Sequence, residues 1–170
     1  MKKMVISIIL ILSLTACSLQ EKMSTELFFK RLEKYDSSIS VNDSFYDGES
    51  FVIYSLYHNA EIVFEISTDT DKSIKKINLA CSDTDKINEF VDCVESVMTI
   101  YTSDDTHQEI IECLFENKSI DNEFRYYDTQ WHKYSAILSD NGLYFSVSNK
   151  KLIPESEVEF SLKQNDIIEY

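Results

Sequence analysis

Apolar side chains recur at helical spacing in three segments of the chain. The most regular repeat begins at Ile87, where apolar residues follow at positions i, i+3, i+4, i+7, i+10, i+11 and i+14. A shorter repeat begins near Asp104, and a third covers about residues 24–36, with Ser24 or Thr25 as its N-cap. The pattern predicts three amphipathic helices, one near the N-terminus and two in succession in the middle.

Elsewhere apolar residues recur in short runs, several of them alternating with polar ones, which is typical of strands. The predicted strands cover residues 51–57, 60–66 and 74–80 before the long helix, and 124–127, 131–138 and 143–147 after the last helix. His58-Asn59 predicts a tight turn between two of them. Asp140-Asn141-Gly142 predicts a hairpin turn, because the dipeptide Asn-Gly suits a type I′ turn, in which both central residues have positive φ.

Strands that are grouped, and do not alternate with helices, indicate an α+β fold. The predicted order is α-β-β-β-α-α-β-β-β, with an antiparallel sheet of five to six strands and the helices packed on one of its faces. Residues 42–48 are expected to form a turn, and an edge strand is expected where Val158, Phe160 and Leu162 alternate. Residues 23–170 are predicted to form one domain.

Composition narrows the class of protein. The chain has 170 residues, of which 44% are hydrophobic, with two glycines and one proline. This excludes a disordered tail, which would be poor in apolar residues, and a low-complexity segment rich in Gly and Pro. The 16 Lys and Arg against 30 Asp and Glu give a formal net charge of −14, which argues against nucleic acid as a partner.

The first residues have the layout of an export signal. Two lysines follow Met1, and the eleven residues 4–14 are mostly apolar. This run is too short for a membrane-spanning helix, which needs about 20 apolar residues, and matches the hydrophobic region of a signal peptide. It leads into Leu14-Thr15-Ala16-Cys17, which resembles the lipobox of bacterial lipoproteins. An ordinary secretory signal or a signal anchor, with an incidental Cys17, is the alternative.

The resemblance implies that residues 1–16 are removed and that diacylglycerol is attached to the thiol of Cys17. Signal cleavage would fall between Ala16 and Cys17, and residues 17–22 would form a lipidated N-terminus with a short linker. The protein is accordingly expected at the extracytoplasmic face of the cell membrane, or at the outer membrane in a Gram-negative host. Because two acyl chains hold a protein stably on a bilayer, the membrane is its first expected partner.

The spacing of reactive residues predicts no catalytic or metal-binding site. His58, His107 and His132 lack the i, i+3 or i, i+4 spacing of metal ligands, both among themselves and with the cysteines. Asp69-Thr70-Asp71 and Asp83-Thr84-Asp85 start like calcium loops but lack the required Gly and the final Glu, so turn and cap positions are expected for them. No cofactor is predicted besides the lipid on the N-terminal cysteine.

Three cysteines follow Cys17 in the sequence. Cys93 and Cys113 lie on the two successive predicted helices, so a disulfide between them is one possibility, with Cys81 left as a free thiol. Buried free thiols that pack as small apolar side chains are the other possibility. A catalytic cysteine is not expected, because a reactive thiolate needs a neighbouring base and no local pattern supplies one.

Aromatic residues are concentrated in the C-terminal strands. Tyr126, Tyr127, Trp131 and Tyr134 are candidates for a partner-binding surface, because Tyr and Trp are enriched at binding hot spots. Tyr126 and Tyr127 are consecutive and point to opposite faces of a strand, so at least one is expected on the side away from the helices. Packing within the sheet, where aromatic residues are favoured, is the alternative.

These observations predict a membrane-anchored, non-enzymatic binding or envelope-interaction module whose partner is a protein, a peptide or a glycan. Loss of Lys2 and Lys3 with the signal changes the charge to 14 − 30 = −16. This charge suggests a second hypothesis, an inhibitor or immunity protein for a cationic partner such as a muramidase or a toxin, since opposite charge speeds association. A third hypothesis is a hydrolase that acts on envelope polymers.

Overall fold

Seven antiparallel strands form the sheet in the computed structural model, which describes residues 23–46, 50–102 and 106–153. The strands are β1 (Ile39–Tyr46), β2 (Ser50–Tyr57), β3 (Ala60–Thr68), β4 (Ile74–Cys81), β5 (Phe124–Asp128), β6 (His132–Ser139) and β7 (Gly142–Asn149). Their order across the sheet is β1-β2-β3-β4-β7-β6-β5. The described helices are α2 (Thr25–Tyr35), α3 (Ile87–Tyr101) and α4 (His107–Leu114), with short 3-10 turns η1 (Thr84–Lys86) and η2 (Glu116–Lys118). The α+β class and the antiparallel sheet are confirmed.

The strand count and the element order differ from the prediction, because the chain forms β1 where a turn was expected over residues 42–48. The observed order is α-β-β-β-β-α-α-β-β-β. In this edge strand only Ile39 is buried, and the pairing with β2 shifts register between Val41 and Asp43. A strand exposed on both faces needs no apolar alternation, and the Asn, Asp and Ser in its middle are typical of turns. The edge strand expected around Phe160 lies outside the described residues.

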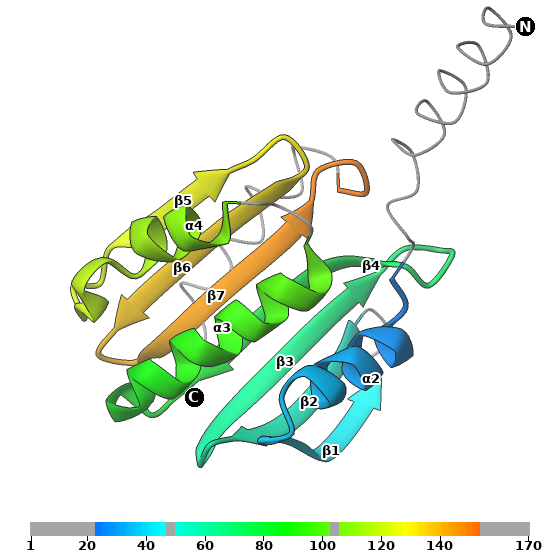
Figure 1. The fold of residues 1–170 in the computed structure, drawn as a ribbon, viewed down its shortest axis with the longest axis horizontal. Helices are drawn as coiled ribbons and strands as arrows, with labels where there is room; N and C mark the ends of the chain where they lie inside the picture. The colour runs from blue at the N-terminus through cyan, green and yellow to red at the C-terminus, as the bar shows by residue number, and fades with distance from the viewer. Residues whose placement is uncertain (1–22, 47–49, 103–105, 154–170) are drawn as a thin grey trace, which may run out of the picture.

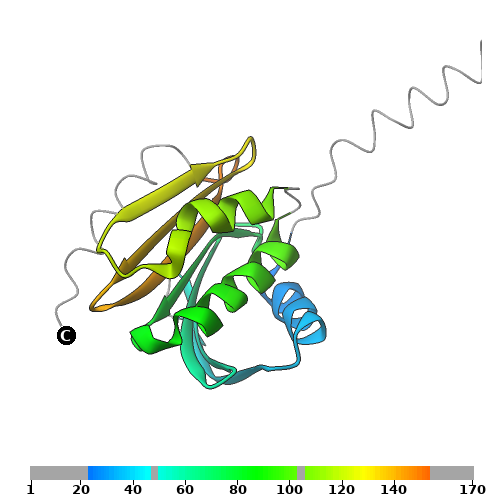
Figure 2. The ribbon, with the colours of Figure 1, turned by 60° about the vertical axis from the view of Figure 1, so that its left-hand side comes forward.

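The helices α2, α3 and α4 lie on one face of the sheet, as Figure 2 shows from the side. α3 contacts β2, β3 and β7, and α4 contacts β5 and β6 (Figure 1). Strand residues that point toward the helices are buried in alternation, as in β3, where Ala60, Ile62, Phe64 and Ile66 are fully buried. The opposite side of the sheet, called the far face below, carries none of these three helices.

α3 provides the centre of the core. The apolar stripe predicted from Ile87 onward is buried from Phe90 to Tyr101. The Phe90 ring meets Phe115 edge-on at 6.4 Å between centroids, and Phe115 in turn lies 6.3 Å from Phe145 of β7. Each such side chain contributes about 1.5–3 kcal/mol by leaving water, so burial of this stripe is the main attachment of the helix layer to the sheet.

The N-terminal end of the described chain is fixed at the β3–β4 hairpin. The backbone amide of Ile74 donates a hydrogen bond to the carbonyl oxygen of Met23 at 2.8 Å, and Ser24 forms a β-bridge with Ser73. Ser24 is also the N-cap of α2, because its hydroxyl accepts a hydrogen bond from the amide of Leu27 at 3.3 Å. α2 therefore starts at the same end of the sheet as the β3–β4 turn (Figure 1).

Both predicted hairpin turns form, but the second has a different geometry. His58 and Asn59 connect β2 to β3 with φ values of 46° and 75°, and a type I′ turn requires positive φ at both positions. Between β6 and β7 the loop is Asp140-Asn141, and Gly142 is already the first residue of β7, with a φ of 149°. The prediction of a hairpin here is correct, but the predicted type I′ geometry with Asn141-Gly142 at its centre is wrong.

Replacing Gly142 with alanine should lower the free energy of unfolding by about 1–3 kcal/mol. The positive φ is unfavourable for a residue with a Cβ, and the added Cβ would lie 3.1 Å from the carbonyl oxygen of Cys81 and 3.2 Å from the hydroxyl of Tyr144. Urea unfolding measures the change, with Asn141→Ala in the adjacent exposed loop as the control. Equal unfolding midpoints for the two variants would show that the backbone relaxes without cost.

Candidate functional site

The four aromatic residues predicted as a binding surface lie in different environments. Tyr126 and Tyr127 are consecutive in β5 and point to opposite sides of the sheet. The Tyr127 hydroxyl donates a hydrogen bond to Oε2 of Glu109 on α4 at 3.2 Å. Tyr126 lies on the far face, where 67% of its surface is exposed. Of this pair, only Tyr126 lies on the side away from the helices.

Tyr134 is part of the core. It is 1% exposed and pairs across the sheet with Val147 of β7, which is fully buried. Its ring lies 6.0 Å from that of His132, which is also 1% exposed. A side chain at this depth has no surface to offer a partner, so Tyr134 does not join Tyr126.

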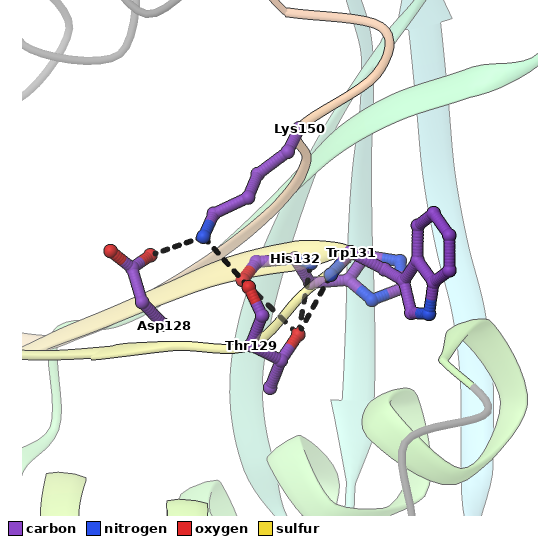
Figure 3. A network of polar contacts seen from close by, with 5 residues as sticks. All are labelled: Asp128, Thr129, Trp131, His132 and Lys150. Carbon is purple, nitrogen blue, oxygen red and sulfur yellow. Dashed lines mark hydrogen bonds and ion pairs between the residues drawn. The ribbon is translucent and has the colours of Figure 1, made fainter.

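Trp131 lies in the turn between β5 and β6, and a polar network holds this turn (Figure 3). The hydroxyl oxygen of Thr129 accepts hydrogen bonds from the backbone amides of Trp131 at 3.3 Å and His132 at 3.0 Å. The Nζ atom of Lys150 donates to the carbonyl oxygen of Thr129 at 2.7 Å and forms an ion pair with Asp128 at 3.3 Å. The chain that follows β7 is thereby fastened to the β5–β6 turn.

The Trp131 ring is only partly accessible. Lys151 places its Nζ atom 4.0 Å from the ring centroid, a cation–π contact worth about 0.5–1 kcal/mol at an exposed site. The backbone amide of Lys150 also donates to the Trp131 carbonyl oxygen at 2.9 Å. We conclude that Trp131 and the network around it stabilise the hairpin, at a distance along β5 from the exposed Tyr126.

Exposed aromatic rings form two groups: Phe45 stacks on Tyr54 across β1 and β2, and Phe124, Tyr126 and Tyr144 lie on the far face over β5 and β7. Strand register places two rows of side chains side by side there. The residues of these rows, called the uncharged patch below, are Asn78, Ser146, Ser135 and Tyr126 in one row and Ala80, Tyr144, Ile137 and Phe124 in the other. None of them is charged, although 27% of the chain is. The sequence singled out only Tyr126 of this set, because the grouping depends on the register of four strands.

The histidines occupy the elements expected for them. His58 is exposed in the β2–β3 turn, and His132 is buried at the start of β6. His107 begins α4, and its Nε2 atom lies 2.8 Å from the hydroxyl of Thr102. Within residues 23–46, 50–102 and 106–153, no three His, Cys, Asp or Glu side chains come together as a metal site would need.

The three cysteines of the described chain are free thiols. The disulfide considered between Cys93 and Cys113 is not formed: Cys93 is on the buried side of α3, and Cys113 is exposed on α4. Burial raises the pKa of the Cys81 and Cys93 thiols, so both are protonated at neutral pH. They pack as small apolar side chains, which is the alternative that the sequence left open for them.

The outer surfaces of α3 and α4 carry negative charge alone. Neither helix contains Lys or Arg, and their acidic residues face solvent or lie at its edge: Glu89, Asp92 and Glu95 on α3, and Glu109 and Glu112 on α4. Lys86 of η1 lies 3.6 Å from Glu89 and neutralises part of this charge. The helix layer and the uncharged patch therefore present opposite kinds of chemistry on the two sides of the sheet.

The fold and its two surfaces define an α+β domain with one helix-covered and one uncovered sheet face. No family model matches the chain, and no curated protein or solved structure matches it either. Among the described residues, no helix is long and apolar enough to cross a membrane. Function is therefore inferred from the residues themselves.

Proposed function

We propose that the protein is a membrane-anchored, extracytoplasmic bacterial lipoprotein that acts as a non-enzymatic binding module. The order of a basic start, a short apolar run and Leu14-Thr15-Ala16-Cys17 supports the anchor. In this proposal residues 1–16 are removed and diacylglycerol on Cys17 holds the chain to the bilayer.

The fixed start of the domain limits how far it extends from such an anchor. Six peptide steps separate Cys17 from Met23, which span at most about 22 Å when fully extended. Met23 is buried and accepts the hydrogen bond from Ile74 at the β3–β4 hairpin. In the anchored protein this end of the sheet faces the bilayer, and the hairpin at His58-Asn59 points away from it.

Replacing Cys17 with serine should abolish incorporation of radioactive palmitate and release the protein from the membrane fraction. The thioether to diacylglycerol needs the cysteine sulfur, and the domain's net negative charge gives it no affinity for an anionic bilayer. Cys113→Ser is the matched control, since Cys113 is exposed and lies outside the lipobox. Equal labelling of the Cys17 variant and the wild type would refute the anchor.

The uncharged patch is the observation that supports binding as the activity. Exposed rings of Tyr126, Phe124 and Tyr144 on one surface are unusual for a protein without a partner, because large apolar groups on a surface favour association. Labelled protein is expected to bind isolated envelope fragments saturably, and Tyr126→Ala is expected to weaken this binding. Binding that does not saturate, or that is unchanged in the variant, would count against the patch.

The acidic helix layer favours a second candidate, an inhibitor or immunity protein for a cationic partner. Association with a purified cationic muramidase should slow about tenfold or more between low and high ionic strength, because salt screens steering forces. Asp92→Lys on the exposed side of α3 should slow it further at low salt, whereas Asp43→Lys on β1 should change it little. An association rate that is independent of salt would exclude this candidate.

A further inference from the structure

The uncharged patch contains closely spaced aromatic rings. Phe124 and Tyr126 stack with centroids 6.4 Å apart and planes tilted by 23°, and they are 46% and 67% exposed. Tyr144, 38% exposed, lies in the row of Phe124 two strands away, which is about 10 Å. The patch thus offers two ring positions separated along a line across the strands.

Small polar groups adjoin these rings. Ser135 and Ser146 are neighbours of Tyr126 in the same row, and each hydroxyl donates one hydrogen bond and accepts two. Asn78 ends the row, and its Nδ2 atom donates to Oε2 of Glu65 at 2.8 Å, which fixes the amide. Rings and hydroxyls therefore lie side by side, and the carboxylate beside Tyr126 on the same strand, Asp128, is paired with Lys150.

This combination selects among the partner classes. The patch itself holds no charge for a charged peptide, a nucleic acid or an anionic headgroup, and the next row on this face, with Lys76, Lys133 and Asp128, carries both signs. A purely apolar peptide would leave the serine hydroxyls unpaired. A sugar ring has an apolar face of C–H groups that stacks on an aromatic ring and a rim of hydroxyls that pairs with Ser and Asn. We propose that the uncharged patch binds the pyranose rings of a neutral glycan.

This inference rests on the proposed binding function and names its ligand class. The probes are hexasaccharides of β-1,4-linked glucose and of β-1,4-linked N-acetylglucosamine, titrated calorimetrically against the full chain. At least one is expected to bind, and Tyr126→Ala is expected to weaken it about tenfold or more, as for a residue at a binding hot spot. Tyr35→Ala on α2 is the matched control, because Tyr35 is 57% exposed on the helix side.

Two results would overturn the proposal: no binding of either sugar at millimolar concentration, or equal affinity in the wild type and Tyr126→Ala. A dimer in sedimentation that Tyr126→Ala dissociates would assign the patch to a second copy of the chain. If the sugars bind only when the residues after Ile153 have been removed, the patch would be the binding site of the chain's own C-terminal residues. If envelope fragments bind through Tyr126 while both sugars fail, the binding function stands and the glycan is excluded.

Discussion

Tyr134→Ala is expected to lower the free energy of unfolding by about 3–5 kcal/mol, the range found when a large aromatic residue is removed from a core. Tyr134 is 1% exposed and is among the largest fully buried side chains of the protein. Tyr126→Ala, by contrast, should cost less than about 1 kcal/mol, because 67% of Tyr126 is in contact with water and its loss leaves no cavity.

Urea unfolding of both variants tests this contrast, with a common denaturant dependence as the sign that the unfolded states are alike. The pair separates the two interpretations that the sequence allowed for the C-terminal aromatic residues, surface recognition and packing. Similar losses for Tyr134→Ala and Tyr126→Ala would mean that β6 is not inserted in the sheet with the register observed here. The difference in unfolding free energy between Tyr134→Ala and Tyr126→Ala therefore tests both the fold and the location of the patch.

Periodicity predicted the elements that bury one face. The stripe from Ile87 matches α3 to its last residue, Tyr101, because every turn of that helix packs on the sheet. The alternation over residues 60–66 likewise matches the inward side of β3. β1 was not predicted, because its residues after Ile39 are exposed on both faces and such a strand has no alternation of apolar and polar residues.

The candidate surface was harder to predict because it depends on which face the helices cover. Tyr126, Tyr127 and Tyr134 are the same amino acid, and the sequence predicts all three to lie in strands. Their environments differ because Tyr127 and Tyr134 point toward the helix layer, where Tyr127 bonds to Glu109 and Tyr134 is buried, whereas Tyr126 points to the far face. The serines of the uncharged patch come from β6 and β7, and no single segment of the sequence indicates that they adjoin Tyr126.

A double-mutant cycle on Asp36 and Tyr57 should give a coupling of about 1–2 kcal/mol, allowing for the partial exposure of Asp36. The Asp36 carboxylate follows α2 and accepts hydrogen bonds from the Tyr57 hydroxyl at 2.7 Å and from Ser38, at 2.6 Å from its hydroxyl and 2.9 Å from its amide. This contact joins the end of the first helix to β2. Asp36→Asn and Tyr57→Phe remove the charge and the donor with little change in shape.

Stability should depend on pH through both partners. Hydrogen bonds from Ser38 and Tyr57 lower the pKa of Asp36, so its contribution is complete above its unfolded value of about 4 and is lost as the pH falls through the folded pKa. Burial and the hydrogen bond to Asp36 raise the pKa of Tyr57. Its contribution is complete below about pH 10 and is lost as the pH rises toward the folded pKa.

Each variant should therefore flatten a different limb of the profile of unfolding free energy against pH. Asp36→Asn removes the group whose folded pKa is lowered and should reduce the loss below about pH 4, whereas Tyr57→Phe should reduce the loss above about pH 10. Asp140→Asn, in the exposed β6–β7 loop, is the control. A double-mutant cycle of Asp140→Asn with Tyr57→Phe should give a coupling energy of zero. If Asp36→Asn and Tyr57→Phe were additive and both limbs unchanged, the contact would contribute nothing, and α2 would be held to the sheet by the burial of Phe28 and Leu32 alone.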